Sequence, residues 1–341
     1  MDGKAAFHVL HLLETPRIGI AKVYAILDMA NSYAMSLSDF LYKPSSLKEV
    51  LNDSQIDAFL ALEDKTRQIW DDLEEKGVQL VPVTDDNYPE RLRTLLGKKA
   101  PPLLMVQGNT DLLKKLSVGF CGSRKASPKG IATAKDCAVQ LAREGVNIVS
   151  GYAAGIDMAT HLAALECGGT TTLVLCEGIL NFSIKREIKD LWDWERIAVV
   201  SEFLPGLPWN AHNAMQRNRT ICALSAAMIL IEAGNTGGSI EAGRTCLRMG
   251  VPLFAPVYEG MPESAVGNRE LLQQGAYSLL KNRRTGRANM GTMLSVIKGK
   301  VPDSKKKNDF HEIETLETDQ LSLFDSRKDY SPKNKCKRQE S

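Results

Sequence analysis

Residues 118–157, VGFCGSRKASPKGIATAKDCAVQLAREGVNIVSGYAAGID, decide the fold of this chain. An apolar run at 116–121 ends in the sequence GSR, and a second run at 146–149 ends in SG. The amphipathic pattern of 128–144 joins them, which indicates a βαβ unit with parallel strands and a right-handed crossover. Both strands then end at one edge of the sheet, where open α/β sheets bind ligands and helix N-termini attract phosphate.

The same alternation of strand and helix continues to about residue 280. The runs TTLVLC and MILIEA are apolar throughout, as expected of parallel strands that are buried on both faces. We therefore expect an α/β fold with a doubly wound, mostly parallel sheet. The expected strands are 116–121, 146–150, 170–176, 197–201, 227–232 and 252–257, and the expected helices are 128–144, 156–167, 183–194, 217–225, 238–249 and 267–274.

Two flanking regions differ from this pattern. Residues 1–80 have helical periodicity, and LLETPRIGIAKVYAIL predicts a helix, a short turn and a helix. Such a hairpin can bind a nucleic-acid backbone through its turn amides, or it can belong to a small bundle used for packing or self-association. Residues 286–341 have too few apolar side chains for a core. We expect a helical domain at 1–80, the α/β domain at 81–285, and a charged, largely disordered tail at 286–341.

The composition is that of a soluble cytoplasmic protein. The 341 residues are 43% hydrophobic and 25% charged, and no apolar run approaches the roughly 20 residues of a membrane-spanning helix. The N-terminal sequence does not have the pattern of a secretory signal peptide. Seven scattered cysteines without a CxxC pair argue against zinc and fit a reducing compartment. We expect no metal, no cofactor and no membrane association.

Charge is distributed unevenly. The net charge is +2, but residues 281–341 carry an excess of six positive charges, so the preceding body carries −4. A polyanion bound by the body must therefore meet a local cluster of cations.

Two turns at the carboxyl edge could bind an anion. In the first, GSRKAS at 122–127, glycine lets backbone amides approach a phosphate, the serines donate hydroxyls and Arg124 offers a guanidinium. A plain turn with a solvent-facing arginine is equally consistent with this sequence. In the second, Asp157 and His161 are four residues apart and favour a structural pair over a metal site. The candidate residues of these turns are Gly122, Ser123, Arg124, Ser127, Ser150, Gly151 and Gly155.

Two later segments point to the same chemistry. The sequence RNR at 217–219 offers two planar forks for phosphate and an amide, although its arginines could instead pair with Glu202 or Glu232. The sequence EAGNTGGS at 232–239 is a third glycine-rich turn that opens a helix. The candidate residues here are Arg217, Asn218, Arg219, Gly237, Gly238 and Ser239.

The order of these motifs resembles the DNA-processing protein A family, also called DprA or Smf. The similar segments are DDNYPERL, PPLLMVQGN, GSRKASPKG, SGYAAGIDMATH, RNRTICALS, IEAGNTGGS and GNRELLQQGA, within residues 8–280. The resemblance implies an extended Rossmann-like fold without settled catalytic activity. It implies a dimer that binds single-stranded DNA and hands it to a RecA-type recombinase in DNA uptake, recombination or repair. It places Arg124, Arg217 and Arg219 on phosphates, with the other candidate residues lining the pocket.

Several features depart from the family or go beyond it. Ala154 stands where the family usually has arginine, which marks a divergent member. Gly238-Ser239-Ile240-Glu241 is similar to a turn of LOG-like nucleoside-monophosphate phosphoribohydrolases, an enzymatic alternative. A nucleotide-sensing module in phage defence is another alternative. In the tail, Gln320, Leu321, Leu323 and Phe324 belong to a pentapeptide that resembles sliding-clamp-binding motifs.

Overall fold

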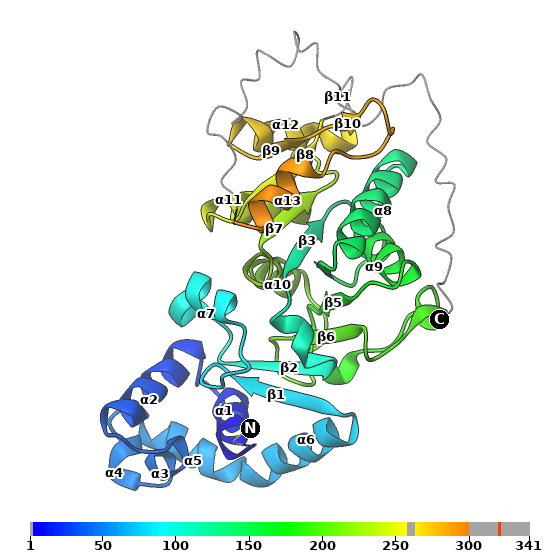
Figure 1. Cartoon of the computed structure of the whole chain (residues 1–341). Helices are drawn as coiled ribbons and strands as arrows, with labels where there is room; N and C mark the ends of the chain where they lie inside the picture. The colour runs from blue at the N-terminus through cyan, green and yellow to red at the C-terminus, as the bar shows by residue number, and fades with distance from the viewer. Residues whose placement is uncertain (1–2, 258–262, 300–319, 322–341) are drawn as a thin grey trace. The chain divides into compact units, whose positions relative to one another are not determined.

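The computed structural model describes residues 3–257, 263–299 and 320–321 of the chain (Figure 1). By its internal contacts the chain forms two compact units, and segments distant in sequence contribute to each. The first unit contains Met1–Lys114, Leu175–Ser183 and Ala198–Asn210, and the second contains Lys115–Val174, Ile184–Ile197 and Ala211–Ser341.

The first unit combines short helices with antiparallel strands. Its strands run in the order β1-β2-β6, with Leu80 opposite Met105 and Val106 opposite Val200. The helices bury leucine, valine, isoleucine and phenylalanine side chains at helical spacing, which is the pattern that predicted them. The elements are α1 (Gly3–Glu14), α2 (Ile20–Ser32), α3 (Leu37–Leu41), α4 (Pro44–Leu47), α5 (Asp53–Ala61), α6 (Glu63–Glu75), β1 (Val78–Pro82), α7 (Glu90–Leu96), β2 (Leu103–Gly108) and β6 (Ile197–Ser201).

The turn between α1 and α2 has the helix–turn–helix form that the sequence predicts. Arg17 adopts a left-handed φ of 66° in this turn, a conformation in which few residues other than glycine are found. Gln55 on α5 stabilises it, because its Nε2 donates to the carbonyl of Arg17 at 2.8 Å. Binding of nucleic acid by this hairpin stays a prediction.

The second unit contains the parallel sheet. Its strands run in the order β5-β4-β3-β7-β8-β9, and all five of their pairings are parallel. The elements are β3 (Ser117–Cys121), α8 (Pro128–Arg143), β4 (Asn147–Ser150), α9 (Ile156–Glu166), β5 (Thr171–Val174), α10 (Ala211–Leu224), β7 (Ala227–Leu230), α11 (Gly238–Arg248), β8 (Leu253–Pro256), α12 (Val266–Gln273), β9 (Tyr277–Leu279), β10 (Lys281–Asn282), α13 (Gly291–Ile297) and β11 (Gln320–Leu321).

Helices cover both faces of this sheet. One buried cluster joins α8, α9 and α13 to the strands through Phe120 and Ile148. The other joins α10, α11 and α12 through Val149 and Met228, which point to the opposite face. Side chains alternate between faces along a strand, so β3, β4, β7 and β8 each contribute to both clusters. This doubly wound arrangement confirms the fold class that the sequence predicts.

Two predicted helices differ from the structure. Residues 183–194 form turns and one short 3-10 helix, Lys189–Leu191, because the amide of Lys185 donates to the hydroxyl of Tyr152 and Ile188 is fully buried. The helix predicted to begin at residue 217 begins at Ala211. The apolar periodicity starts only in its second half, whereas its first half is mainly polar and includes exposed residues such as His212 and Met215. The RNR sequence therefore lies inside α10 rather than at its start.

The core continues beyond residue 285. The segment 286–299 contains α13, whose Met293 is fully buried in the same cluster as Phe120. In the expected tail, Gln320–Leu321 pair antiparallel with Lys281–Asn282. Residues 300–319 and 322–341, including Leu323 and Phe324 of the clamp-like motif, lie outside the described part of the chain. The domain boundaries at 80 and 285 stay predictions.

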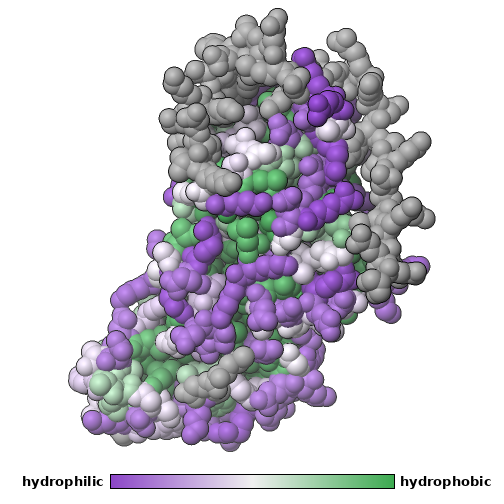
Figure 2. All heavy atoms as spheres, in the orientation of Figure 1, coloured by the Kyte–Doolittle hydropathy of each residue, from purple (hydrophilic) through white to green (hydrophobic). Residues whose placement is uncertain are grey.

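On the face shown in Figure 2, hydrophilic side chains predominate, and apolar ones are visible only in small areas between them. No helix in the described residues is both long and apolar enough to cross a membrane.

Truncation of Met293 tests whether α13 belongs to the core. Met293→Ala should lower the free energy of unfolding by about 2–5 kcal/mol, because it removes buried methylene groups and leaves a cavity. Chemical denaturation measures this change. The matched control is Thr292→Ala, a partly exposed neighbour on the same helix. Equal stabilities of the two variants would contradict the packing of α13.

Candidate functional site

The turn from β3 to α8 runs close against the start of α9. A Cβ at Gly122 would lie 2.6 Å from the side chain of Ile156, so only glycine fits here without displacement. The Ser123 hydroxyl accepts the amide of Lys125 at 3.0 Å, which shapes the turn. Arg124 is exposed at its tip. The turn thus presents a cation and backbone groups at the carboxyl edge of β3.

The polar groups of Ser127 are engaged within the protein, and its contact with phosphate stays a prediction. Its amide donates to Glu232 Oε2 at 2.9 Å, and its hydroxyl donates to Glu232 Oε1 at 2.5 Å. The same hydroxyl accepts the amide of Gly130 and so caps α8. Glu232 is fully buried after β7, and a Cβ at Gly130 would lie 2.6 Å from its carboxylate. This contact joins the first turn to the end of β7 and occupies the Ser127 donors.

The turn from β4 to α9 meets the first turn. Gly155 has a φ of 80°, and a Cβ there would lie 2.4 Å from the carbonyl of Ser123. Ser150 is fully buried, with its hydroxyl 2.9 Å from both the Phe120 carbonyl and Asp157 Oδ1. Asp157 Oδ2 also accepts the amide of Ala153 at 3.2 Å. Gly155 is thus at the surface of the site, whereas Ser150 is part of its support.

His161 belongs to the same buried support. Its Nε2 lies 2.6 Å from the carbonyl of Gly151, which can only accept, so Nε2 carries the proton. Burial lowers the pKa of His161 and outweighs the hydrogen bond to Gly151, which raises it. The lowered pKa favours the neutral ring, and Nδ1 lies 2.6 Å from the Thr171 hydroxyl, which also contacts the carbonyl of Ile148 at 2.8 Å. His161 and Asp157 support the turn through separate partners rather than as a pair.

Arg217 is the buried cation of the site. Only 6% of it is exposed, and a Cβ at Gly151 would lie 1.8 Å from its Nη1. The guanidinium thus packs directly on the backbone of the second turn. Its Nε is buried without a hydrogen-bond partner among the described residues. A buried guanidinium in this state favours an anionic ligand, because unsatisfied charged donors are costly to bury.

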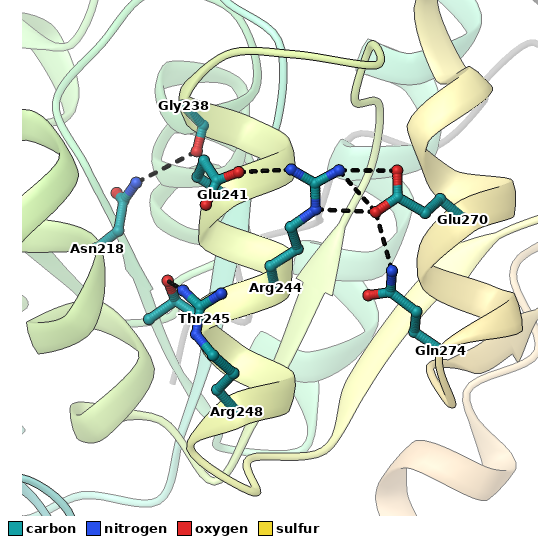
Figure 3. Close-up of polar contacts among 8 residues, drawn as sticks. All are labelled: Asn218, Gly238, Glu241, Arg244, Thr245, Arg248, Glu270 and Gln274. Carbon is teal, nitrogen blue, oxygen red and sulfur yellow. Dashed lines mark hydrogen bonds and ion pairs between the residues drawn. The ribbon is translucent and has the colours of Figure 1, made fainter.

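The third turn leads into α11. Gly237 has a φ of 102°, and both Gly237 and Gly238 are exposed. The side-chain amide of Asn218 donates to the carbonyl of Gly238 at 3.4 Å, which joins α10 to this turn (Figure 3). Ser239 and Arg219 are partly exposed. The amides at the start of α11 are oriented toward an incoming anion by the helix itself.

A buried amide fixes the beginning of this turn. Asn268 on α12 accepts the amide of Ala233 at 3.0 Å and donates to the carbonyl of Ile231 at 2.9 Å. A Cβ at Gly267 would lie 2.4 Å from the carbonyl of Gly234. Gly267 and Asn268 of the GNRE sequence therefore support the third turn from behind.

Glu241 forms part of a surface network. Arg244 Nη1 donates to its Oε1 at 2.6 Å, and Nη2 and Nε of the same arginine donate to Glu270 at 2.9 and 2.8 Å (Figure 3). Gln274 also donates to Glu270 at 2.9 Å. Figure 3 shows the carboxylate of Glu241 directed toward Arg244. The network accounts for Glu241 as a helix-surface residue, and the hydrolase alternative stays a prediction.

Sequence reasoning missed Lys185. Its Nζ donates to the carbonyl of Tyr152. The same Nζ lies 4.2 Å from the centre of the aromatic ring of Tyr152, which is a cation–π contact. It thereby adds a positive charge to the second turn, where Ala154 is exposed. Lys185 is 33 residues from this turn in a segment predicted to be helical, so no local signal connected the two.

The structure therefore brings the four candidate segments together in one unit. Gly155 contacts the first turn, Gly151 contacts Arg217, and Asn218 contacts the third turn. Arginines, a lysine, small residues and helix N-termini are suited to successive phosphates. Within the described residues, no group of three or more His, Cys, Asp or Glu side chains could hold a metal ion.

The neutral state of His161 predicts a dependence of stability on pH. Because its pKa is lowered in the folded protein, the unfolded chain binds more protons below about pH 6.5, and stability falls with falling pH. His161→Gln removes this titration, so its melting temperature should fall less steeply than that of the wild type. His212→Gln, at an exposed position, is the matched control. Parallel curves for wild type and His161→Gln would contradict the assignment.

Comparisons with known proteins agree with the fold. The profile of the DNA recombination-mediator protein A family matches residues 79–286. The Smf protein of Escherichia coli is 34% identical over 208 residues, which cover 60% of this chain and 54% of that protein. DprA of Streptococcus pneumoniae is 35% identical over 199 residues, which cover 57% of this chain and 68% of that protein. The matched part is thus about half of the first relative and two thirds of the second.

Solved structures give the same result. The X-ray structure of DprA from Streptococcus pneumoniae has a TM-score of 0.69 at 27% identity and covers 80% of this chain and 94% of its own. The structure of DNA processing protein A from Helicobacter pylori has a TM-score of 0.52 at 24% identity and covers 65% of this chain and 94% of its own. The family profile spans well over half of the sequence, and the resemblance seen in the motifs is confirmed. The chain belongs to the DNA recombination-mediator protein A family.

Proposed function

We propose that this protein binds single-stranded DNA along its phosphate backbone and presents the strand to a RecA-type recombinase. The observation that carries the proposal is Arg217, a buried guanidinium whose Nε has no partner in the described part of the chain. It packs on Gly151 of the second turn, and the next residue, Asn218, donates to Gly238 of the third turn. Phosphate oxygens are the ligands that a guanidinium fork binds most strongly.

The site favours a strand over a small anion. Arg124 comes from the first turn, Arg217 and Arg219 come from α10, and the third turn adds the amides of α11. Each such group suits one phosphate, so several phosphates of one chain can be bound in succession. Backbone contacts carry no sequence information, and they leave the bases accessible for pairing.

The relatives support the same ligand. The Helicobacter pylori protein is described as having a single-stranded DNA binding mode. This chain matches about half of the Smf protein. The activity of that whole protein does not follow from the match, and we propose it for this chain on the grounds given above. In the part of the chain that the structure describes, no contact favours the nucleotide-sensing or hydrolase alternatives over DNA binding.

The biological setting is also proposed. We infer a cytoplasmic homodimer that acts without catalysis in DNA uptake, recombination or repair. Its tail is proposed to bind the sliding clamp through Gln320, Leu321, Leu323 and Phe324, since a short apolar segment can insert into a preformed groove.

Two arginine substitutions test DNA binding, one that removes a positive charge and one that keeps the charge but removes the planar guanidinium. Arg124→Gln combined with Arg217→Lys should weaken binding to labelled oligo-dT by about tenfold or more, because each hydrogen bond to a charged group contributes about 1.5–3 kcal/mol. The loss should be equal for mixed sequences, and duplex DNA should bind more weakly than single strands to the wild type. Filter binding measures both.

The control is Arg248→Gln, which removes an exposed arginine that donates to Thr245. Thermal melting verifies that each variant is folded. Wild-type affinity for oligo-dT in the double variant, with its fold intact, would contradict the proposal.

A further inference from the structure

A cationic hairpin follows the last strand of the parallel sheet. Lys281 pairs with Ala288, and the amide of Asn282 donates to the carbonyl of Arg287 at 2.8 Å. The segment 281–299 contains five Lys or Arg residues and no Asp or Glu. The body before residue 281 carries a net charge of −4, so this hairpin starts the positive part of the chain.

The hairpin is anchored on α8. Asp136 has only 3% of its side chain exposed; its Oδ1 accepts from Arg287 Nε at 2.6 Å and its Oδ2 accepts the amide of Ala288 at 2.8 Å. Gln140 Nε2 donates to the carbonyl of Ala288 at 3.0 Å. Figure 1 shows the hairpin beside α8. The second strand of the hairpin is thus fixed to a helix of the core, and the first strand is held through its pairing with the second.

The tip of the hairpin is ordered by hydrogen bonds within the turn. Asn282 Oδ1 accepts the amides of Arg284 and Thr285 at 2.9 and 3.0 Å. Gly286 adopts a φ of 69° and donates to the carbonyl of Asn282 at 2.8 Å. The side chains of Arg283 and Arg284 are exposed at this tip. Two adjacent guanidinium groups therefore project from a rigid turn, which lowers the entropy lost when a ligand binds.

We propose that the 281–288 hairpin is a second contact for the phosphate backbone of the bound strand. Exposed arginines on a fixed turn suit bidentate contacts with phosphate, and the hairpin supplies positive charge that the body lacks. Asp136, which anchors the hairpin, lies eight residues after the start of α8, about 12 Å along the helix from the first turn. This proposal rests on the proposed function, since both contacts would bind one strand.

The salt dependence of binding tests the hairpin separately from the turns. Arg283→Gln with Arg284→Gln removes two phosphate contacts, so the slope of log K against log salt should become less steep by about 1.4. The full-length protein is titrated with long oligo-dT over a range of salt. Arg283→Lys with Arg284→Lys keeps the charges and should retain most of the slope.

The matched control is Arg143→Gln with Arg248→Gln, which removes two exposed arginines from elsewhere in the same unit and should leave the slope unchanged. A hairpin variant with the wild-type slope would overturn this proposal while leaving DNA binding by the turns intact. Absence of binding by the wild type would instead overturn the proposed function, and the hairpin proposal with it.

Discussion

Parallel pairing of β3 with both β4 and β7 is the constraint on which the site depends. Val118 is opposite Ile148 on one side and Ala227 on the other. In this register the three strands end at one edge, so their following turns meet there although they are separated by more than 100 residues in sequence. A shift of register would separate the turns and reverse the faces of the strands. The turns need no catalytic side chain to form a site, only the shared edge.

Buried polar groups hold that edge in place. Glu232, Ser150 and His161 each have hydrogen-bond partners that join neighbouring strands or turns, which offsets the cost of burying them. Arg217 is different, because its Nε remains without a partner in the described residues. An arginine with an unsatisfied donor, set in a framework of paired polar groups, is suited to binding a phosphate. Stability and binding thus rest on different members of the same cluster.

The sequence predicted the sheet and its turns more successfully than the roles of single residues. Strands such as 227–230 are buried on both faces and therefore read as apolar runs, and glycines marked the turns. The contact between Ser127 and Glu232 spans 105 residues, so a serine in a glycine-rich turn was interpreted as a phosphate donor although it caps a helix. The burial of Arg217 was equally invisible, since arginine is rarely buried and its partner surface is the backbone of Gly151. Local pattern identifies a turn, but tertiary contacts decide which of its donors remain available.

Amide hydrogen exchange with and without saturating oligo-dT tests the central claim most directly. It reports on the turns themselves, without substitutions that could disturb their support. We predict slower exchange in all three turns, at residues 122–127, 151–155 and 237–239, when the strand is bound. Protection elsewhere, with exchange in these turns unchanged at saturating DNA, would contradict a phosphate site at the carboxyl edge of the sheet.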